Sequence, residues 1–456
     1  MVKTDTIAAV ATPPGHGAIG IIRISGDQAF DIVSRYLHPV RGVFDPSKVK
    51  GYSLRYGEWK IDGECIDEVL ISFFVSPYSY TGEHVVEVSC HGSPYILQKV
   101  MESCLDAGAR LADPGEFTLR AFKNGKIDLG QAEAIADLIA SETKASHRVA
   151  MQQLKGNFSR ELDEMRTRLI EFTGLLELEL DFAEEDVEFA DRGHFIELLS
   201  SIQRRLTALI DSFSLGNAIK NGVPVAILGA PNAGKSTLLN ALIGEEKAIV
   251  SHIAGTTRDV IEDVMTIEGI QFRFTDTAGL RTTTNEIEEI GIRKALEKAS
   301  KARIILYVFD AVLSTDDEIL STYNLIQNHA PEATIIKIGN KADLLNHRLI
   351  TGDDILYISA KEKTGIDQLK DALINEVLHK KNIDNQTIVT NIRHVDMLKK
   401  SLKSIEEAQR GLQSGLSSEL VAIDLRNALY HLGSITGKVV SDDILDYIFA
   451  NFCIGK

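Results

Sequence analysis

The sequence predicts a multidomain protein that combines α/β domains with an all-α domain. Its 456 residues exceed what one hydrophobic core usually holds and suggest about three domains. Short β-rich runs alternate with helical stretches in two parts of the chain, whereas elsewhere apolar residues recur at helical spacing. We therefore expect an N-terminal α/β domain, a helical domain, and a second α/β domain with a doubly wound, mainly parallel sheet.

The composition is that of an ordinary globular protein, with 44% hydrophobic and 25% charged residues. No apolar run approaches the roughly 20 residues that span a bilayer, so no membrane association is expected, and the first residues lack a signal-peptide pattern. The four cysteines form no CxxC pair, which argues against a zinc or redox site and favours the cytoplasm. A net charge of −16 makes the chain a poor lone binder of RNA, which would require a local basic patch or a basic partner.

The N-terminal α/β domain is expected over residues 1–118. Strand-like runs occur at residues 69–75 and 85–88, and Gly and Pro residues punctuate the region.

The helical domain is predicted to be discontinuous. Apolar residues have helical spacing over residues 119–217 and again over residues 381–456. The economical interpretation is one helical domain built from both segments, with an α/β domain over residues 218–380 inserted as a surface excursion. Two separate helical domains are the alternative.

A phosphate-binding loop is the strongest signal in the chain. A β-type run at residues 223–228 precedes Gly229-Ala-Pro-Asn-Ala-Gly-Lys-Ser236, and a helix-like run follows at residues 237–243. This is the GxxxxGK[ST] pattern in its strand–loop–helix context. The glycines let backbone N–H groups face phosphate oxygens, Lys235 reaches the β- and γ-phosphates, and the Ser236 hydroxyl binds magnesium. The expected nucleotide contacts here are Asn232, Ala233, Gly234, Lys235, Ser236 and Thr237.

Three further motifs follow in order, each directly after a strand-like run. The carboxylate of Asp276-Thr-Ala-Gly279 can reach the magnesium ion, and its glycine N–H can meet the γ-phosphate. The Asp343 carboxylate of Asn340-Lys-Ala-Asp343 can accept two hydrogen bonds from guanine, a donor pair that adenine lacks. Ser359-Ala-Lys361 fits a loop that contacts the base carbonyl. Together the four motifs predict a GTP-hydrolysing P-loop domain, with contacts from Asp276, Thr277, Ala278, Gly279, Asn340, Lys341, Asp343, Ser359, Ala360 and Lys361.

A candidate switch lies at Gly255-Thr-Thr-Arg-Asp259. A threonine there can complete the magnesium shell when a γ-phosphate is present, and Thr257 is the better candidate. An exposed polar turn is the alternative. Ras-type GTPases place a water-orienting Gln directly after DxxG, but here that position is Leu280, so another group must orient the attacking water.

The order of these parts resembles the MnmE (TrmE) family of tRNA-modification GTPases from end to end. The resemblance is also carried by segments outside the nucleotide motifs: Asp5-Thr-Ile-Ala-Ala-Val-Ala-Thr-Pro-Pro-Gly15, Ile21-Ile-Arg-Ile-Ser-Gly26, Pro114-Gly-Glu-Phe117, Lys126-Ile-Asp-Leu-Gly-Gln131 and Phe452-Cys-Ile-Gly-Lys456. A P-loop GTPase inserted in a helical domain and ending in CIGK is highly specific to this family.

The resemblance implies a function that composition and spacing do not show. Such proteins act with a flavin-bearing partner, MnmG, in a heterotetramer, and install an aminomethyl-type group on carbon five of the wobble uridine of certain tRNAs. The N-terminal domain is similar to the family's tetrahydrofolate-binding module, which also dimerises. The resemblance therefore implies a homodimer and a formyl- or methylene-tetrahydrofolate cofactor.

By position, Arg23, Glu87, Lys126 and Lys456 match the residues that the family links with the folate. Their charges are reasonable for this role, because cations suit the folate glutamate carboxylates and a carboxylate suits the donor edge of the pterin. Cys453 lies inside the CIGK motif, and it is either close to the one-carbon chemistry or a buried packing residue.

In this family a potassium ion stands in for an arginine finger, and the resemblance assigns it to Asn232 and to oxygens of Ser251, Ile253 and Thr256. Glu288 matches the water-activating acid, which acts through a second water when two G domains meet. Arg281 and Arg258 are lesser candidates for stabilising the switch.

Two other functions stay open at this level. The nucleotide motifs alone fit a GTP-controlled assembly factor, such as one acting on the ribosome, but the N-terminal domain together with the CIGK end favours the modification enzyme. A folate-dependent transferase that GTP merely regulates differs mainly in emphasis.

Overall fold

The computed structural model describes residues 5–181, 192–244, 262–275, 299–345, 354–378, 387–450, 452 and 455. The chain divides into two compact units. Unit 1 comprises Met1–Ala136, Gln153–Glu177 and Leu425–Lys456, and unit 2 comprises Asp137–Gln152 and Leu178–Asp424. Both units draw on distant segments of the sequence, and the boundaries placed at residues 118, 217 and 380 stay predictions.

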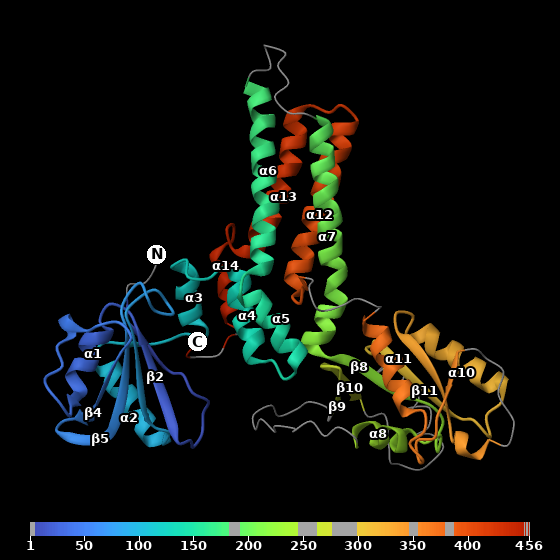
Figure 1. Ribbon diagram of the computed structural model, residues 1–456, viewed down its shortest axis with the longest axis horizontal. Coiled ribbons are helices and arrows are strands. Elements are labelled where there is room, and N and C mark those ends of the chain that lie inside the picture. The colour runs from blue at the N-terminus through green and yellow to red at the C-terminus, as the bar shows by residue number, and fades with distance from the viewer. Residues whose placement is uncertain are drawn as a thin grey trace. The chain divides into compact units, whose positions relative to one another are not determined.

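Unit 1 contains a sheet, drawn in blue in Figure 1, whose seven described strands lie in the order β3-β4-β5-β6-β2-β1-β7. All neighbouring strands are antiparallel except β1 and β7. The strands are β1 (Ile7–Val10), β2 (Ile19–Ser25), β3 (Leu37–Pro39), β4 (Ser53–Ile61), β5 (Glu64–Phe74), β6 (Val85–His91) and β7 (Arg110–Leu111). The strands predicted at residues 69–75 and 85–88 are confirmed as parts of β5 and β6.

Helices α1 (Ala29–Tyr36) and α2 (Pro94–Asp106) contribute to the buried core of this sheet, which includes Trp59 and Phe73. Side chains alternate between the two faces of a strand. Arg23 and Glu87 are opposite one another on β2 and β6 and are only partly buried, unlike their core-facing neighbours. The other helices with residues in unit 1 are α3 (Glu116–Lys123), α4 (Leu129–Ile139), α6 (Asn157–Asp181), α13 (Ser418–Thr436) and α14 (Asp442–Phe449).

The segment from Lys126 to Gln131 contains the residues that cap the N-terminus of α4. The Asp128 backbone N–H donates to Oε1 of Gln131 (3.0 Å), and the Gln131 N–H donates to Oδ1 of Asp128 (2.8 Å). This reciprocal pair is a capping box for α4. Nε2 of Gln131 also donates to the Leu154 carbonyl oxygen (2.9 Å), so the motif fixes where α4 begins.

Unit 2 contains a second sheet, whose six described strands lie in the order β13-β12-β11-β8-β10-β9. All neighbours are parallel except β9 and β10. The strands are β8 (Val223–Leu228), β9 (Glu262–Ile267), β10 (Ile270–Thr275), β11 (Ile304–Asp310), β12 (Thr334–Asn340) and β13 (Ile355–Tyr357). The predicted mainly parallel sheet is confirmed, and the carboxyl ends of β8, β11 and β12 meet at one edge.

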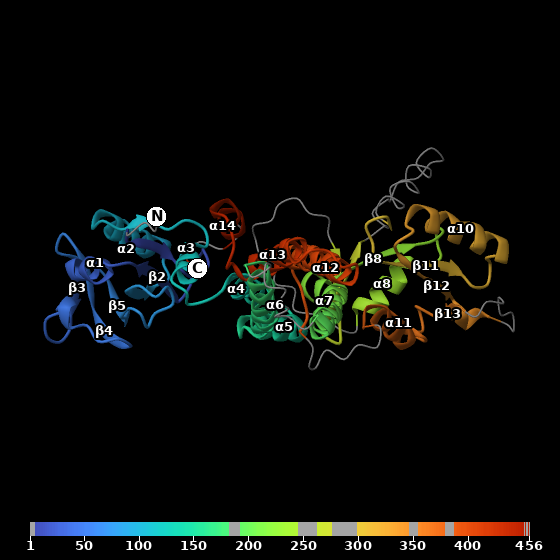
Figure 2. The ribbon, with the colours of Figure 1, turned by 90° about the horizontal axis from the view of Figure 1, so that it is seen from above.

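Helices cover both faces of this sheet, as its doubly wound class requires. Residues of α8 (Lys235–Ile243) and α11 (Ile366–Leu378) pack in one buried cluster and residues of α10 (Asp316–His329) in another, on the opposite side of β11 and β12 (Figure 2). The remaining helices with residues in unit 2 are α5 (Lys144–Leu154), α7 (Arg192–Asn221) and α12 (Ile392–Gln413), of which α7 and α12 run alongside each other (Figure 1).

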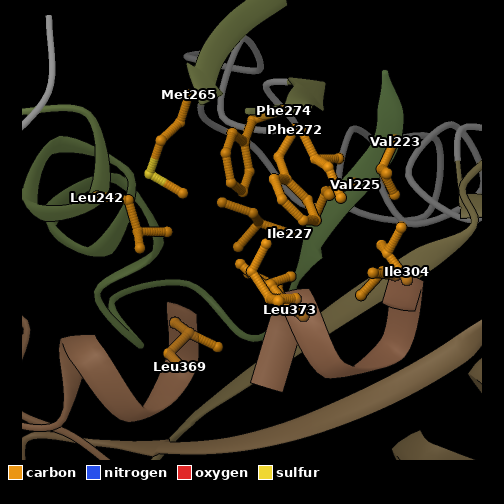
Figure 3. Close-up of a cluster of buried hydrophobic side chains, with 14 of the residues drawn as sticks. Val223, Val225, Ile227, Leu242, Met265, Phe272, Phe274, Ile304, Leu369 and Leu373 are labelled. Carbon is orange, nitrogen blue, oxygen red and sulfur yellow. The ribbon is translucent and has the colours of Figure 1, made fainter. Parts of the chain in front are cut away.

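The larger cluster extends beyond the α/β domain. Phe272 and Phe274 of β10 pack with Val225 and Ile227 of β8, above Leu369 and Leu373 of α11 (Figure 3). Val149 of α5, Leu215 and Ile219 of α7, and Ile388 belong to the same cluster. The inserted domain is therefore more than a surface excursion, because α7 runs directly into β8 and its last apolar turns complete the core of the sheet.

Candidate functional site

The loop between β8 and α8 follows a backbone path that requires glycine at two points. Gly229 has a φ of 151° and Gly234 a φ of 93°, values that residues with a Cβ atom rarely adopt. A Cβ atom at Gly229 would overlap the carbonyl oxygen of Val308, and one at Gly234 would overlap Nδ2 of Asn340. The loop therefore lies directly against the ends of β11 and β12, with α8 starting immediately after it.

Lys235, the first residue of α8, bends back over this loop. Its Nζ donates to the carbonyl oxygens of Gly229 (2.8 Å) and Ala230 (2.9 Å). Burial lowers the pKa of the ammonium group, because its charge is partly removed from water. Ser236 and Thr237 are exposed in the same first turn. A lysine and a helix N-terminus at one loop form a site suited to a phosphate group.

Asn340, at the end of β12, ties two predicted motifs together. Its Nδ2 donates to the carbonyl oxygen of Ala233 in the phosphate loop (2.8 Å), and its Oδ1 accepts from the Ala360 N–H (3.0 Å). The side chain is 2% exposed, so both bonds form away from water, where an unpaired amide would be costly. One side chain thus sets the distance between the phosphate side and the base side of the site.

Lys341 follows in the left-handed conformation, with a φ of 66°. Its Nζ forms an ion pair with Oδ2 of Asp310 at the end of β11 (2.7 Å), and Oδ1 of Asp310 accepts from the Val312 and Leu313 N–H groups. Burial would raise the pKa of Asp310, but the bonds from Lys341 and these amides outweigh it and hold the pKa below its usual value. The lysine is therefore fixed by a carboxylate from a neighbouring strand.

The remaining base-side residues lie nearby. Asp343 is exposed in a short 3₁₀ turn, and the preceding Ala342 N–H donates to the Ile358 carbonyl oxygen (3.0 Å). Ser359 is buried, and its Oγ accepts from the Glu362 N–H (3.2 Å). Lys361 is exposed. The structure therefore brings the loops after β8, β12 and β13 together, as the motif order predicts.

The rest of the predicted nucleotide site lies outside the described residues. These positions are Ser251, Ile253, Thr256, Thr257, Arg258, Asp276, Thr277, Ala278, Gly279, Arg281 and Glu288. Cys453 and Lys456 also lie outside them. The last residue of β10 is Thr275, and β10 is parallel to β8, so Thr275 lies at the same sheet edge as the phosphate loop.

In the N-terminal domain, Arg23 and Glu87 form a partly buried ion pair. Nε and Nη2 of Arg23 both donate to Oε1 of Glu87, at 3.0 and 2.8 Å, and Nη1 donates to the carbonyl oxygen of Gly455 (3.0 Å). The rings of Tyr80 and Phe117 lie 5.6 and 5.7 Å from the guanidinium carbon. The arrangement holds the residue next to Lys456 against the same sheet face.

Lys126 lies beside the loop that carries Tyr80. Its Nζ donates to the carbonyl oxygen of Pro77 (3.0 Å), and its aliphatic stem runs past Gly82. Burial raises the pKa of the Tyr80 hydroxyl, although Thr118 and Arg23 oppose the shift. Three of the four predicted folate residues therefore contact one another or a common loop.

Two family patterns match the chain. The pattern described as "GTP-binding protein TrmE N-terminus" matches residues 6–126, and the pattern described as "MnmE helical domain" matches residues 129–453. The chain belongs to the MnmE family of tRNA-modification GTPases. Curated relatives named "tRNA modification GTPase MnmE" match along their whole length. The relative from Flavobacterium psychrophilum is 51% identical over 463 residues and the one from Flavobacterium johnsoniae 50% over 467 residues, with 100% of both chains covered in each case.

The MnmE relative from Cytophaga hutchinsonii is 49% identical, covering 99% of this chain and 98% of its own. Solved structures of G domains cover about a third of the chain. The FeoB G domain from Methanococcus jannaschii is 26% identical, with a TM-score of 0.26, and covers 34% of this chain and 97% of its own. That TM-score adds nothing to the MnmE assignment, which depends on the relatives above.

Sequence reasoning missed several partners in these MnmE sites. Asp310 carries a weak signal, an acid at the end of an apolar strand, whereas Tyr80 carries none. Phe117 and Gly455 lie in segments that carry the family resemblance, but their contacts with Arg23 arise only through the fold. The described residues contain no group of three or more His, Cys, Asp or Glu side chains placed to hold a metal ion. No helix in the described part of the chain is long and apolar enough to cross a membrane.

Proposed function

We propose that this MnmE-family GTPase works with the flavoprotein MnmG to modify carbon five of the wobble uridine of certain tRNAs. The added group is aminomethyl or carboxymethylaminomethyl, and a formyl- or methylene-tetrahydrofolate supplies its one-carbon unit. The protein acts in the cytoplasm as a homodimer that joins MnmG in a heterotetramer. The observation that carries the nucleotide part is the pair of bonds by which Asn340 joins the phosphate loop to Ala360. The relatives' shared name supports the tRNA part.

GTP binds with its phosphates at the start of α8. Lys235 exchanges its two carbonyl partners for phosphate oxygens, which satisfies a half-buried ammonium better than neutral carbonyls do. The exposed Ser236 hydroxyl, with Thr257, suits magnesium, a hard cation that prefers oxygen ligands and that would neutralise phosphate charge. Asp276 and Gly279, which follow β10 in the sequence, would act on the metal and on the γ-phosphate.

Asp343 selects guanine by accepting hydrogen bonds from its ring N–H and amino group. In an Asp343→Asn variant the amide can instead donate to the carbonyl that xanthine carries in place of the amino group. The KM for GTP should rise by roughly 100-fold or more, and turnover of xanthosine triphosphate should appear. Equal turnover of ATP and GTP by the unchanged protein would contradict the assignment.

Potassium activates hydrolysis when two G domains meet. Asn232 is exposed in the phosphate loop with a φ of 61°, so its side chain is available to help hold a monovalent cation together with Ser251, Ile253 and Thr256. The cation would offset charge on the phosphoryl group, while Glu288 orients the water and Arg281 stabilises the switch. Exchanging potassium for sodium should lower kcat; unchanged turnover would remove the role of Asn232.

The folate binds at the Arg23–Glu87 pair and at Lys126, and Lys456 and Cys453 are further candidates that the sequence supplies. Among the described residues Oε2 of Glu87 has no hydrogen-bond partner, so it is free to accept from the pterin, and the exposed Lys126 suits a folate carboxylate. An Arg23→Gln variant should lose folate binding but retain GTP turnover. Nucleoside analysis of tRNA from cells that lack the gene tests the whole assignment, because a wobble uridine that is still modified in those cells would exclude it.

A further inference from the structure

The loop between β5 and β6, residues 75–84, contacts two of the cations proposed to bind folate. The Tyr80 ring lies 5.6 Å from the Arg23 guanidinium carbon, and the Pro77 carbonyl oxygen accepts from Lys126. Tyr80 is 36% exposed, so part of the residue is accessible to a ligand, while its hydroxyl is hydrogen-bonded to that of Thr118 (2.8 Å). The position of this loop therefore decides where the walls of the N-terminal site lie.

Glu83 holds the loop from its inner side. Its Oε2 accepts from Ser25 Oγ on β2 (2.7 Å), and its two oxygens accept from Nη1 of Arg120 at 3.2 and 3.1 Å. Ser25 Oγ also shares a hydrogen bond with the buried Thr81 hydroxyl (2.8 Å). The loop is therefore fixed to the sheet by Ser25 and to α3 by Arg120.

Helix α3 contacts the site through one stretch of its sequence. Phe117 lies beside the Arg23 guanidinium, Thr118 bonds the Tyr80 hydroxyl, and Arg120 bonds Glu83. Gly115 caps this helix with a φ of 66°, and a Cβ atom there would lie 2.8 Å from the Phe449 carbonyl oxygen. Helix α3 therefore contacts the 75–84 loop on one side and lies close to the end of α14 at Phe449 on the other.

The side chain of Arg120 is buried, which is uncommon for an arginine. Its side chain is 6% exposed, and Nη1 and Nη2 donate to the Asp5 carbonyl oxygen (2.8 Å), Asp5 Oδ1 (2.9 Å) and Glu116 Oε1 (3.0 Å), besides Glu83. A buried ion cluster adds little stability over an apolar one of the same shape, because each charge must leave water. What the cluster provides is a fixed direction for each partner, including Glu83.

We propose that Arg120 is a positioning residue for the N-terminal site: through Glu83 it holds residues 75–84 so that Tyr80 and Lys126 face the ligand together with Arg23. Arg120 itself touches no ligand. The inference rests on the folate site proposed above, but the state of the loop can be measured without folate.

Arg110 provides a matched control. It belongs to the same cluster and donates to Asp5 Oδ2 (2.6 Å) and to Glu116, but none of its bonds reaches residues 75–84. Arg110→Gln and Arg120→Gln therefore remove comparable charges from one cluster, and only the second releases the loop. Arg120→Lys keeps the charge and should restore part of the effect.

The experiment compares these variants by amide hydrogen exchange at residues 75–84 and by affinity for formyltetrahydrofolate. We expect Arg120→Gln to speed loop exchange and to raise the Kd by about tenfold or more, and Arg110→Gln to change each by less than about twofold, even if both melt earlier. Glu83→Gln should behave like Arg120→Gln, and it replaces that variant if Arg120→Gln does not fold.

Two results would overturn the proposal: unchanged loop exchange in the Arg120 or Glu83 variant, or an equal loss of affinity in Arg110→Gln. If the unaltered protein binds no formyltetrahydrofolate, the folate site itself is wrong, and loop exchange alone decides whether Arg120 holds the loop.

Discussion

The two candidate sites of this protein are held together by different means. The nucleotide site is shaped by backbone: two glycines with positive φ place the phosphate loop against β11 and β12, and one buried amide joins the loops. The N-terminal site is shaped by charged side chains: Arg23 pairs with Glu87, and Arg120 holds the loop that carries Tyr80. A site shaped by backbone should be sensitive to substitution at a small number of positions. A site shaped by side chains should depend on more positions, each of which tolerates substitution better.

The largest effect is expected at Gly229. A Gly229→Ala side chain would overlap a backbone oxygen of β11, which cannot move without disturbing the sheet. We expect a loss of about 3 kcal/mol or more in unfolding free energy, and no measurable GTP turnover.

Gly174 is the control for this substitution. It lies in α6, where an added Cβ atom would meet open space, so Gly174→Ala should leave stability unchanged or raise it by roughly 0.5–1 kcal/mol. Thermal unfolding and GTP turnover check both variants. Full activity in Gly229→Ala would contradict the view that backbone shapes this site.

Removing the buried amide should have the next largest effect. Asn340→Ala leaves the Ala233 carbonyl and the Ala360 N–H without their partner, at a cost of about 2 kcal/mol, and should weaken GTP binding by roughly tenfold or more. The exposed Asn240 of α8 is a suitable control, because Asn240→Ala should leave nucleotide affinity within about twofold. Equal effects at the two positions would show that Asn340 does not join the loops.

A moderate effect is expected from the partly buried ion pair between Lys341 and Asp310 in the nucleotide site. Asp310→Asn removes the charge that holds Lys341, and GTP affinity should fall about three- to tenfold while stability at neutral pH falls slightly. Because the folded pKa of Asp310 is depressed, its stabilising contribution is present above the unfolded pKa of about 3.9 and is lost as pH falls through the folded value. Unfolding of both proteins from pH 7 to pH 3 should therefore show their difference shrinking in acid.

The smallest effect concerns a pair in the N-terminal domain between the exposed His91 and the largely buried side chain of Asp67. Nδ1 of His91 lies 2.7 Å from Oδ1 of Asp67, which raises the pKa of the histidine. The contribution is therefore complete below the unfolded pKa of about 6.5 and is lost as pH rises through the folded value. In His91→Gln, melting temperature should vary less between pH 5.5 and 8.5 than in the unaltered protein, whereas the exposed His16→Gln should change nothing.

The difference between the sites also explains how far the sequence could be interpreted. The phosphate loop and its flanking strand and helix were predictable because residues close in sequence determine this backbone path. The strand expected at residues 223–228 is β8, and the strand-like run expected directly before Asp276 is β10. The link from Asn340 to both loops was not predictable, because the motif gives its position in the chain but not its two partners.

The N-terminal site was inaccessible to local patterns. Glu87 is 64 positions and Gly455 is 432 positions from Arg23 in the sequence, and nothing in the local sequence pairs them with it. Only the family resemblance linked Arg23 and Glu87 with one ligand, and it did not indicate Gly455, Tyr80 or Arg120. The core shared with α5 and α7 was also missed, because helical periodicity shows that a face is apolar but not which sheet it covers.

The register of β10 limits where insertions and deletions can occur in this protein. Phe272 and Phe274 face the core, and Thr275 is paired with Ala226, the third residue from the end of β8. Adding or deleting one residue before Phe272 in β10 would turn both rings toward the opposite face and shift Thr275 by about 3.3 Å along the strand. Insertions and deletions within this six-residue strand should therefore be eliminated, because the length of the strand sets how far it extends toward the sheet edge where the phosphate loop lies.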